Sequence, residues 1–181
     1  MRAVVQMGYG RPSGVLEVRE LDLPSVGDDE VLVRVRAASV HPDAWHVVTG
    51  LPRVLRLMGS GVRHPRDVVP RTDVAGEVES VGAGVTRLRP GDEGFGEAIR
   101  GMQWRNGAAY AEYVAVGQGA LAAKPPQVTF EQAATVPTAG LIALHNLPDQ
   151  EQTPANACSS TASAAGWVPS PCSWHARGVR T

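Results

Sequence analysis

The side chains best suited to chemistry lie in one short segment, His41-Pro42-Asp43-Ala44-Trp45-His46. An imidazole changes charge near neutral pH, and its two nitrogens can donate hydrogen bonds, accept them or bind a metal. Pro42 disfavours helical geometry at His41 and suits the first turn of a helix over residues 43–48. Trp45 and His46 would then lie on the same helix, where Trp45 either packs or forms an aromatic wall for a flat substrate.

A metal site is not predicted. A zinc site needs three or four ligands of suitable geometry, and both cysteines, Cys158 and Cys172, lie in the last fifth of the chain. His41 and Asp73 remain as candidate ligands, and two side chains are too few. From the residues alone, His41 is interpreted as a histidine that caps the helix or packs.

Composition narrows the class of protein. A length of 181 residues suits one domain with an appendage, and 20 glycines and 14 prolines indicate turn-rich β structure. The net charge of −1 gives no electrostatic case for nucleic acid binding. No apolar segment reaches the roughly 18 to 20 residues of a membrane span, and Met1 opens directly into a predicted strand. We expect a cytoplasmic protein that is not embedded in a membrane.

Alternation of apolar and polar residues predicts the elements that must position these side chains. In residues 31–36 the valines face one side and Arg34 and Arg36 face water. Thr129 is a suitable N-cap, with Gln132 at the capping-box position, for a helical stretch over residues 129–147 that Pro137 interrupts. Further strands are predicted over residues 2–7, 15–21, 77–81 and 109–116.

The centre of the chain carries a glycine-rich pattern over residues 72–96, TDVAGEVESVGAGVTRLRPGDEGFG. It resembles the signature of the catalytic, GroES-like domain of medium-chain dehydrogenases/reductases, and matching pieces flank it: MRAVV, DDEVLVRVRAASV, AYAEYVAV and PTAGLIAL. The resemblance covers residues 1–147 and is nearest to the zinc-independent, quinone-oxidoreductase-like branch. It implies a mainly β fold with short helices: a GroES-like, partly open β barrel over residues 1–125, then a helical linker over residues 126–147 that leads toward a Rossmann domain.

The resemblance also implies a reaction and a set of site residues. Members of this branch pass a hydride from NADPH or NADH to a small-molecule substrate, a quinone, enone or carbonyl compound. An Asn usually stands at the position of His41 and places the nicotinamide or the substrate oxygen, and a His can also donate a hydrogen bond there. His46 matches a position near the cofactor ribose, and the Thr138 hydroxyl would contact the carboxamide. Trp45 and Trp104 would line the substrate cleft, with core packing as the alternative for Trp104.

Comparison with zinc-dependent members of the family implies that zinc is absent. Their ligand positions fall on His41, Thr72 and Asp73, which do not reproduce the usual ligands. By analogy NADPH is expected rather than NADH, and the homodimer of intact members is not expected of this chain. Residues 51–70 resemble the variable flap over the substrate cleft, and their arginines are interpreted as a solvated face or, alternatively, an anion site.

Residues 148–181 break the pattern. They contain no Leu, Ile, Met, Phe, Tyr or Lys, so they cannot bury enough apolar surface to fold, and we expect a largely disordered tail. Moving the reading frame back by one base permits PGQRVLVNGVGGGVGTFAVQLARA from Pro154 onward, which resembles a strand, a glycine-rich phosphate loop and a helix start. We hypothesise a frameshift near residues 147–153, and we expect little activity from the chain as printed. The alternatives are a non-catalytic GroES-like binding module and a relative of zinc-type alcohol dehydrogenases.

Overall fold

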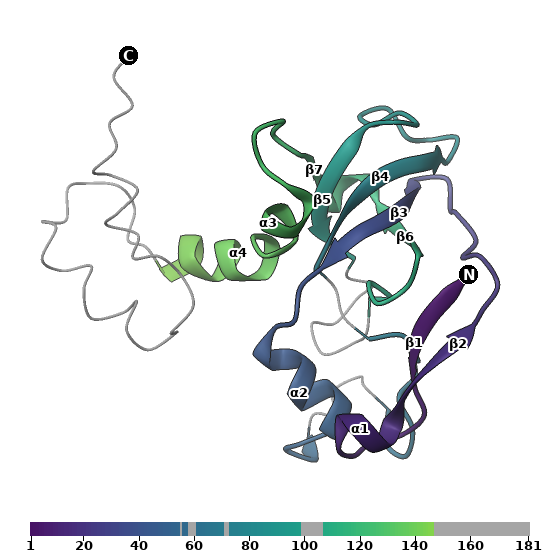
Figure 1. Ribbon diagram of the computed structural model, residues 1–181, viewed down its shortest axis with the longest axis vertical. Coiled ribbons are helices and arrows are strands. Elements are labelled where there is room, and N and C mark those ends of the chain that lie inside the picture. The colour runs from purple at the N-terminus through teal and green to yellow at the C-terminus, as the bar shows by residue number, and fades with distance from the viewer. Residues whose placement is uncertain (55, 58–60, 71–72, 99–106, 147–181) are drawn as a thin grey trace, which may run out of the picture. The chain divides into compact units, whose positions relative to one another are not determined.

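The computed structural model describes residues 1–54, 56–57, 61–70, 73–98 and 107–146 (Figure 1). Chain contacts divide it into two units, Met1–Thr138 and Ala139–Thr181, and each is described by itself. The elements that concern the site all lie in the first unit, apart from the part of one helix that continues past Thr138.

The main sheet of the first unit has five strands in the order β6-β3-β4-β5-β7, and every neighbouring pair is antiparallel. Figure 1 shows β3, β4 and β5 side by side. Valines of β3, β4 and β6 enter one apolar cluster, whose members include Val31, Val33, Val74, Val78 and Val114. The strand bounds are Glu30–Ala38 for β3, Asp73–Val81 for β4, Glu93–Glu97 for β5, Tyr113–Gly117 for β6 and Leu121–Ala123 for β7.

A smaller two-stranded sheet pairs β1 (Arg2–Gln6) with β2 (Leu16–Glu20), and the short helix α1 (Pro12–Val15) lies between them in sequence. The predicted strand over residues 109–116 is confirmed only from Tyr113 onward. The reason is that the residues before Tyr113 form backbone hydrogen bonds with other parts of the chain. The Val4 amide donates to Tyr110 O, the Tyr110 amide donates to Pro70 O, and Ala111 forms a bridge with Ala3.

The helices that follow in the chain include α2 (Pro42–Thr49), α3 (Phe130–Ala134) and α4 (Pro137–Asn146), with a short 3-10 turn at Gln118–Ala120. Pro42 begins α2, as the sequence predicts. The predicted capping box is confirmed, because Thr129 accepts from the Gln132 amide while the Gln132 side chain accepts from the Thr129 amide. Ala133 of α3 packs against Ala75 of β4, which holds this helix on the sheet.

Candidate functional site

The centre of the candidate site is the carboxylate of Asp73, the first residue of β4, whose exposed fraction is 1 %. It accepts a hydrogen bond from Ser39 Oγ at 3.1 Å. It also accepts from Thr138 twice, from Oγ1 at 2.5 Å and from the backbone amide at 3.3 Å. Because a helix leaves its first amides without partners inside the helix, a carboxylate there satisfies a donor and complements the helix dipole at the start of α4.

Glu97 approaches the same hydroxyl from the neighbouring strand. Its Oε1 lies 2.7 Å from Thr138 Oγ1, and Glu97 is the direct cross-strand partner of Asp73. Two carboxylates that face each other across an antiparallel pair repel. A hydroxyl carries one proton, so Thr138 lies between the two carboxylates and can donate to only one of them at a time. Asp73, Glu97, Thr138 and Ser39 are called the carboxylate cluster below.

The cluster reaches the loop that carries His41. Ser39 follows β3 directly and precedes His41 by two residues, and its backbone oxygen accepts from Tyr110 OH at 3.1 Å. Ser39 therefore connects this loop to two other parts of the chain. Its hydroxyl donates to Asp73 of β4, and its carbonyl oxygen accepts from Tyr110 in the segment before β6. Four element ends meet at this point: the end of β3, the start of β4, the end of β5 and the start of α4.

His41 is the N-cap of α2, which bears out helix capping, one of the two roles that the sequence leaves open. Its Nδ1 accepts from the Asp43 amide at 3.4 Å and lies 3.5 Å from Asp43 Oδ2. The first contact requires an unprotonated Nδ1, so the neutral ring then carries its proton on Nε2. The side chain is 20 % exposed. Capping does not exclude the predicted donor role, which stays a prediction.

His46 and Trp45 lie on α2 with their rings in edge-on contact, the centroids 5.1 Å apart. His46 Nδ1 lies 2.8 Å from the Leu51 carbonyl oxygen. A carbonyl only accepts, so Nδ1 carries a proton and Nε2 is the acceptor nitrogen of the neutral ring. Trp45 is 51 % exposed, so an external face is better supported than core packing. Trp104 and Thr72 lie outside the described residues.

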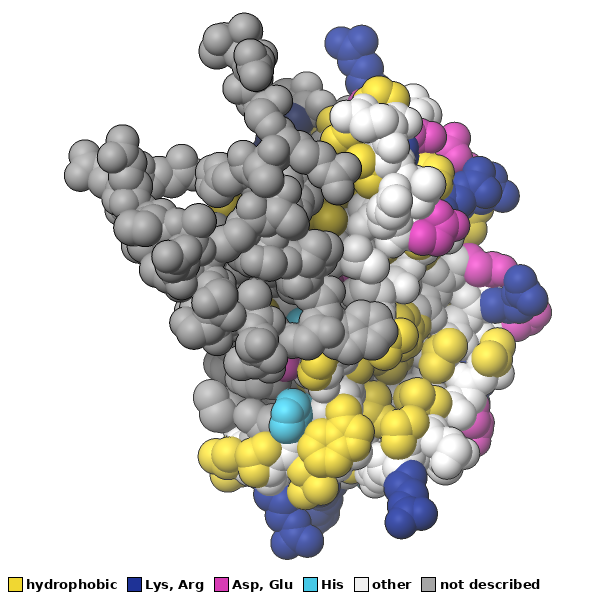
Figure 2. Space-filling view, turned by 60° about the vertical axis from the view of Figure 1, so that its left-hand side comes forward, with side chains coloured by type: hydrophobic (Ala, Val, Ile, Leu, Met, Phe, Trp, Pro, Cys, Tyr) yellow, Lys and Arg dark blue, Asp and Glu magenta, His cyan; other side chains and the backbone are white. Residues whose placement is uncertain are grey.

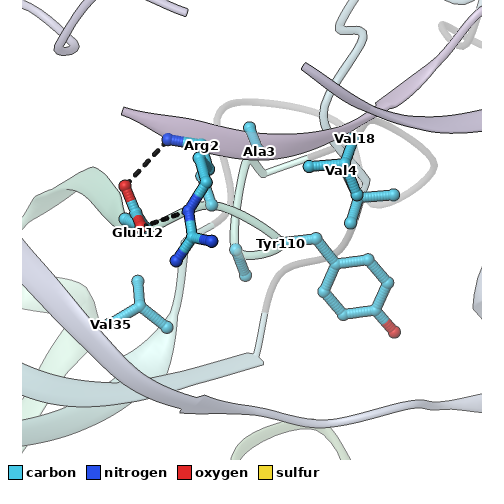
Figure 3. A pocket seen from close by; sticks show the side chains of 9 residues that line it. Arg2, Ala3, Val4, Val18, Val35, Tyr110 and Glu112 are labelled. Atoms are coloured by element: carbon cyan, nitrogen blue, oxygen red, sulfur yellow. Dashed lines mark hydrogen bonds and ion pairs between the residues drawn. The ribbon is translucent and has the colours of Figure 1, made fainter. Parts of the chain in front are cut away.

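A shallow groove of about 360 Å³ lies elsewhere in the first unit, between the two-stranded sheet and residues 109–112 (Figure 3). None of the side chains predicted for the site lines it. At its rim Glu112 accepts hydrogen bonds from the Arg2 amide at 2.8 Å and from Arg2 Nε at 2.9 Å. These two bonds, the backbone one first, lower the pKa of Glu112 below its ordinary value.

Sequence reasoning missed Ser39 and Glu97, and it weighed Asp73 only as a metal ligand. The signal that could have found Glu97 is the register that places residue 97 opposite residue 73, which depends on the loop between β4 and β5. Within the described part of the chain, no group of three or more His, Cys, Asp or Glu side chains could hold a metal ion. Among the same residues, no helix has both the length and the apolar character needed to cross a membrane.

Comparison with known proteins agrees with this architecture. Residues 27–146 match the family model of the alcohol dehydrogenase GroES-like domain. The chain is 32 % identical over 145 residues to a chloroplastic quinone-oxidoreductase homolog of Spinacia oleracea, a match that covers 79 % of this chain and 40 % of the relative. The chain therefore spans well under half of the length of the curated relatives it matches.

Solved structures give the same result. The quinone oxidoreductase of Coxiella burnetii superposes with a TM-score of 0.69 at 29 % identity, covering 80 % of this chain and 43 % of that one. A mycobacterial protein in complex with NADPH gives 0.65 at 26 % identity, covering 84 % and 42 %. The family match over most of the chain, together with the antiparallel sheet and its short helices, carries the assignment. The chain belongs to the alcohol dehydrogenase GroES-like domain family of the medium-chain dehydrogenases/reductases, and it is similar to quinone oxidoreductases.

Proposed function

We propose that the chain is the substrate-side domain of an NAD(P)H-dependent oxidoreductase that passes a hydride to a quinone, an enone or another carbonyl compound without zinc. The observation that carries the proposal is the carboxylate cluster. Through Asp73 it joins the loop of His41 to Thr138, with contacts of 3.1 Å and 2.5 Å. The names of the similar proteins support the same reaction, since two of those described above are quinone oxidoreductases or homologs of them.

The chemistry of the cluster fits the carboxamide of a nicotinamide ring. A carboxamide nitrogen donates hydrogen bonds and its oxygen accepts one, while the cluster offers the Thr138 hydroxyl and the carboxylates of Asp73 and Glu97. When bound, the cofactor would supply the hydride, and the protein orients it and excludes water. NADPH is the proposed form, and the mycobacterial relative binds NADPH in its solved structure.

The two histidines take complementary roles in this proposal. With Nδ1 of His41 accepting from the Asp43 amide, its Nε2–H can donate to the substrate oxygen on which negative charge develops. His46 has the opposite tautomer because its Nδ1 donates to Leu51 O, so its Nε2 suits a ribose hydroxyl, which is a donor. Trp45, half exposed beside His46, would then offer its ring face to a flat substrate.

The printed polypeptide is proposed to be a poor enzyme on its own. The sequence of residues 148–181 contains no glycine-rich phosphate-loop pattern of the kind that holds a pyrophosphate, whereas the shifted frame would restore one. The nucleotide sequence of the gene tests the shift directly. Codons that cannot encode PGQRVLVNGVGGGVGTFAVQLARA in the shifted frame would remove it.

The proposed reaction is tested with two proteins, the 181-residue chain and a version with the frame restored. NADPH binding is followed by nucleotide fluorescence, and turnover is followed with a series of quinones and enones. We expect the restored protein to bind NADPH and turn over, and the printed chain to do neither. Failure of the restored protein to bind NADPH would instead support the non-catalytic binding module. Zinc found in stoichiometric amount by metal analysis would contradict the zinc-free reaction.

A further inference from the structure

The segment that follows α2 has polar contacts on its inside. The Arg56 guanidinium donates to Gly50 O at 2.9 Å and to Thr49 O at 3.3 Å, at the C-terminal end of α2. It also lies over the ring of Tyr9, 4.3 Å from the ring centroid. A cation that donates hydrogen bonds to the last carbonyls of a helix and stacks on an aromatic ring stabilises the local structure. Arg56 therefore anchors this segment from within.

A second contact fixes the far end of the segment. Tyr9 OH donates to Gly61 O at 2.6 Å, and the Gly61 amide donates to Arg56 O at 3.1 Å. Burial raises the pKa of Tyr9, which keeps its donor proton in place. Gly61 has φ of 106°, and a Cβ there would stand 2.2 Å from His64 O, so only glycine fits this turn. The described part of residues 51–66 is therefore held in place by specific contacts, and it is called the lobe below.

The apolar side chains of this lobe point outward. Leu57 is 73 % exposed and Val62 is 62 % exposed, and Leu51 is also exposed. They contribute to none of the core clusters found among the described residues. Figure 2 shows hydrophobic side chains gathered in the lower part of the face that it draws, with Lys and Arg side chains beneath them. Exposed aliphatic residues in such a group usually mark a contact surface.

Charge in the same stretch has one sign. Residues 51–66 contain four arginines and no Asp or Glu, although the whole chain has 17 Lys and Arg against 18 Asp and Glu. Arg53, Arg63 and Arg66 are exposed, while Arg56 is turned inward by the contacts described above. The exposed face of the lobe therefore combines positive charge with aliphatic surface, inside a chain that is close to neutral.

Two features favour a lipid surface over a protein groove as the partner. The exposed apolar residues of the lobe are single Leu and Val side chains, which are under-represented among the residues that dominate protein contacts. Arginines interspersed with aliphatic residues match anionic headgroups above an acyl layer.

We propose that Leu51, Arg53, Leu57, Val62 and Arg63 form a peripheral docking surface for an anionic lipid bilayer. The aliphatic side chains enter between the headgroups, and the arginines contact lipid phosphates. This binding needs no membrane-spanning helix, and it is independent of the proposed hydride transfer.

The test is sedimentation of the 181-residue chain with lipid vesicles. Vesicles of phosphatidylcholine with about a third phosphatidylglycerol should retain the chain at low salt, and pure phosphatidylcholine should not. Raising the salt to about 0.5 M should lower the bound fraction about tenfold, because the charge attraction is screened. The double variants Leu57→Ser with Val62→Ser, and Arg53→Gln with Arg63→Gln, should each bind several-fold more weakly.

The matched control is Val18→Ser with Arg87→Gln, which changes an exposed valine of β2 and an exposed arginine between β4 and β5. It should bind like the unchanged chain, and circular dichroism should show all variants folded. No retention by anionic vesicles would overturn the proposal. Retention of the two lobe variants to the same extent as the unchanged chain would overturn it as well. Complete release by an equal charge of soluble polyglutamate would also overturn it, because an acidic protein partner would then be favoured.

Discussion

The carboxylate of Asp73 is the residue on which the site depends most. It is 1 % exposed and accepts from Ser39 and from both the amide and the hydroxyl of Thr138. Removing a buried acceptor leaves its donors unsatisfied, which costs more than the net value of the hydrogen bonds themselves. We therefore expect Asp73→Ala to lower the free energy of unfolding by about 2 to 4 kcal/mol, measured by urea denaturation.

The matched control for this prediction is Glu79→Ala, which removes an exposed carboxylate from the same strand. This substitution should change the free energy of unfolding by no more than about 0.5 kcal/mol. Equal urea midpoints for the Asp73 and Glu79 variants would show that the hydrogen bonds of the cluster do not stabilise the domain.

Glu112 allows a prediction about pH. Its pKa is lowered first by the bond from the Arg2 amide and second by the bond from the Arg2 side chain. A carboxyl group with a lowered folded-state pKa stabilises the fold above its unfolded-state pKa, near 4.5, and this contribution is lost as the pH falls through the folded-state value. A carbon-detected NMR titration should find Glu112 ionising below the ordinary range.

The variant Arg2→Ala separates the two causes, because it removes the guanidinium and keeps the backbone amide. The pKa of Glu112 should rise only part of the way toward its ordinary value in this variant. A complete return would mean that the side chain of Arg2, and not its backbone, holds the carboxylate.

At the scale of elements, Gly76 lets β3 and β4 approach each other. A Cβ at this position would stand 2.2 Å from Arg34 O and 2.8 Å from Val33 Cγ1, and the β3–β4 pairing shifts register just beyond Val35, the partner of Gly76. Because one contact is with backbone, the strand itself would have to move. Gly76→Ala should lower the free energy of unfolding by about 2 to 3 kcal/mol in a urea titration.

Gly117, in β6, is the matched comparison. A Cβ there would meet nothing within 4 Å, and its φ is not positive. Gly117→Ala should be neutral or stabilising by about 0.5 kcal/mol, since it lowers the entropy of the unfolded chain. If both alanine variants were equally stable, the close approach at Gly76 would not constrain the sheet.

Elements defined by local signals could be predicted from the sequence. Pro42 begins α2, and the capping box of Thr129 and Gln132 begins α3, because both depend on residues within one helical turn. The alternation of residues 31–36 also predicts β3 and its buried valines. The start of β6 could not be predicted, because residues before Tyr113 bond to β1 and to residues 69–70, far away in sequence.

The carboxylate cluster could not be predicted either, because it also depends on residues that lie far apart in the sequence. The cluster draws on four segments of the chain. Strand register pairs Asp73 with Glu97, and hydrogen bonds outside the strand pairing join Ser39 and Thr138 to them. The sequence singles out Thr138 through family resemblance, and the structure adds that its hydroxyl already contacts two carboxylates. Its predicted contact with a nicotinamide carboxamide is a hypothesis for the frame-restored protein.

At the scale of the whole molecule, the apolar core of the described chain lies within the first unit. The three clusters contain residues between Ala3 and Ala134 only, and the segment from Met1 to Thr138 forms one unit of contacts. Residues 148–181, by composition, offer few large apolar side chains to any core. The stability of the first unit should therefore not depend on the last residues of the chain.

This reasoning predicts the behaviour of a chain that ends after Asn146. Its urea unfolding should remain cooperative, with a free energy of unfolding within about 0.5 kcal/mol of the 181-residue chain, because no cluster member is removed. The control is a chain that ends after Thr129, which removes α3 and the pair Ala133 and Ala134 that packs on Ala75. That chain should lose several kcal/mol, since two buried side chains and a capped helix disappear together. If the chain that ends after Asn146 also failed to fold, residues 147–181 would contribute to the core, and the assignment of stability to the first unit would be wrong.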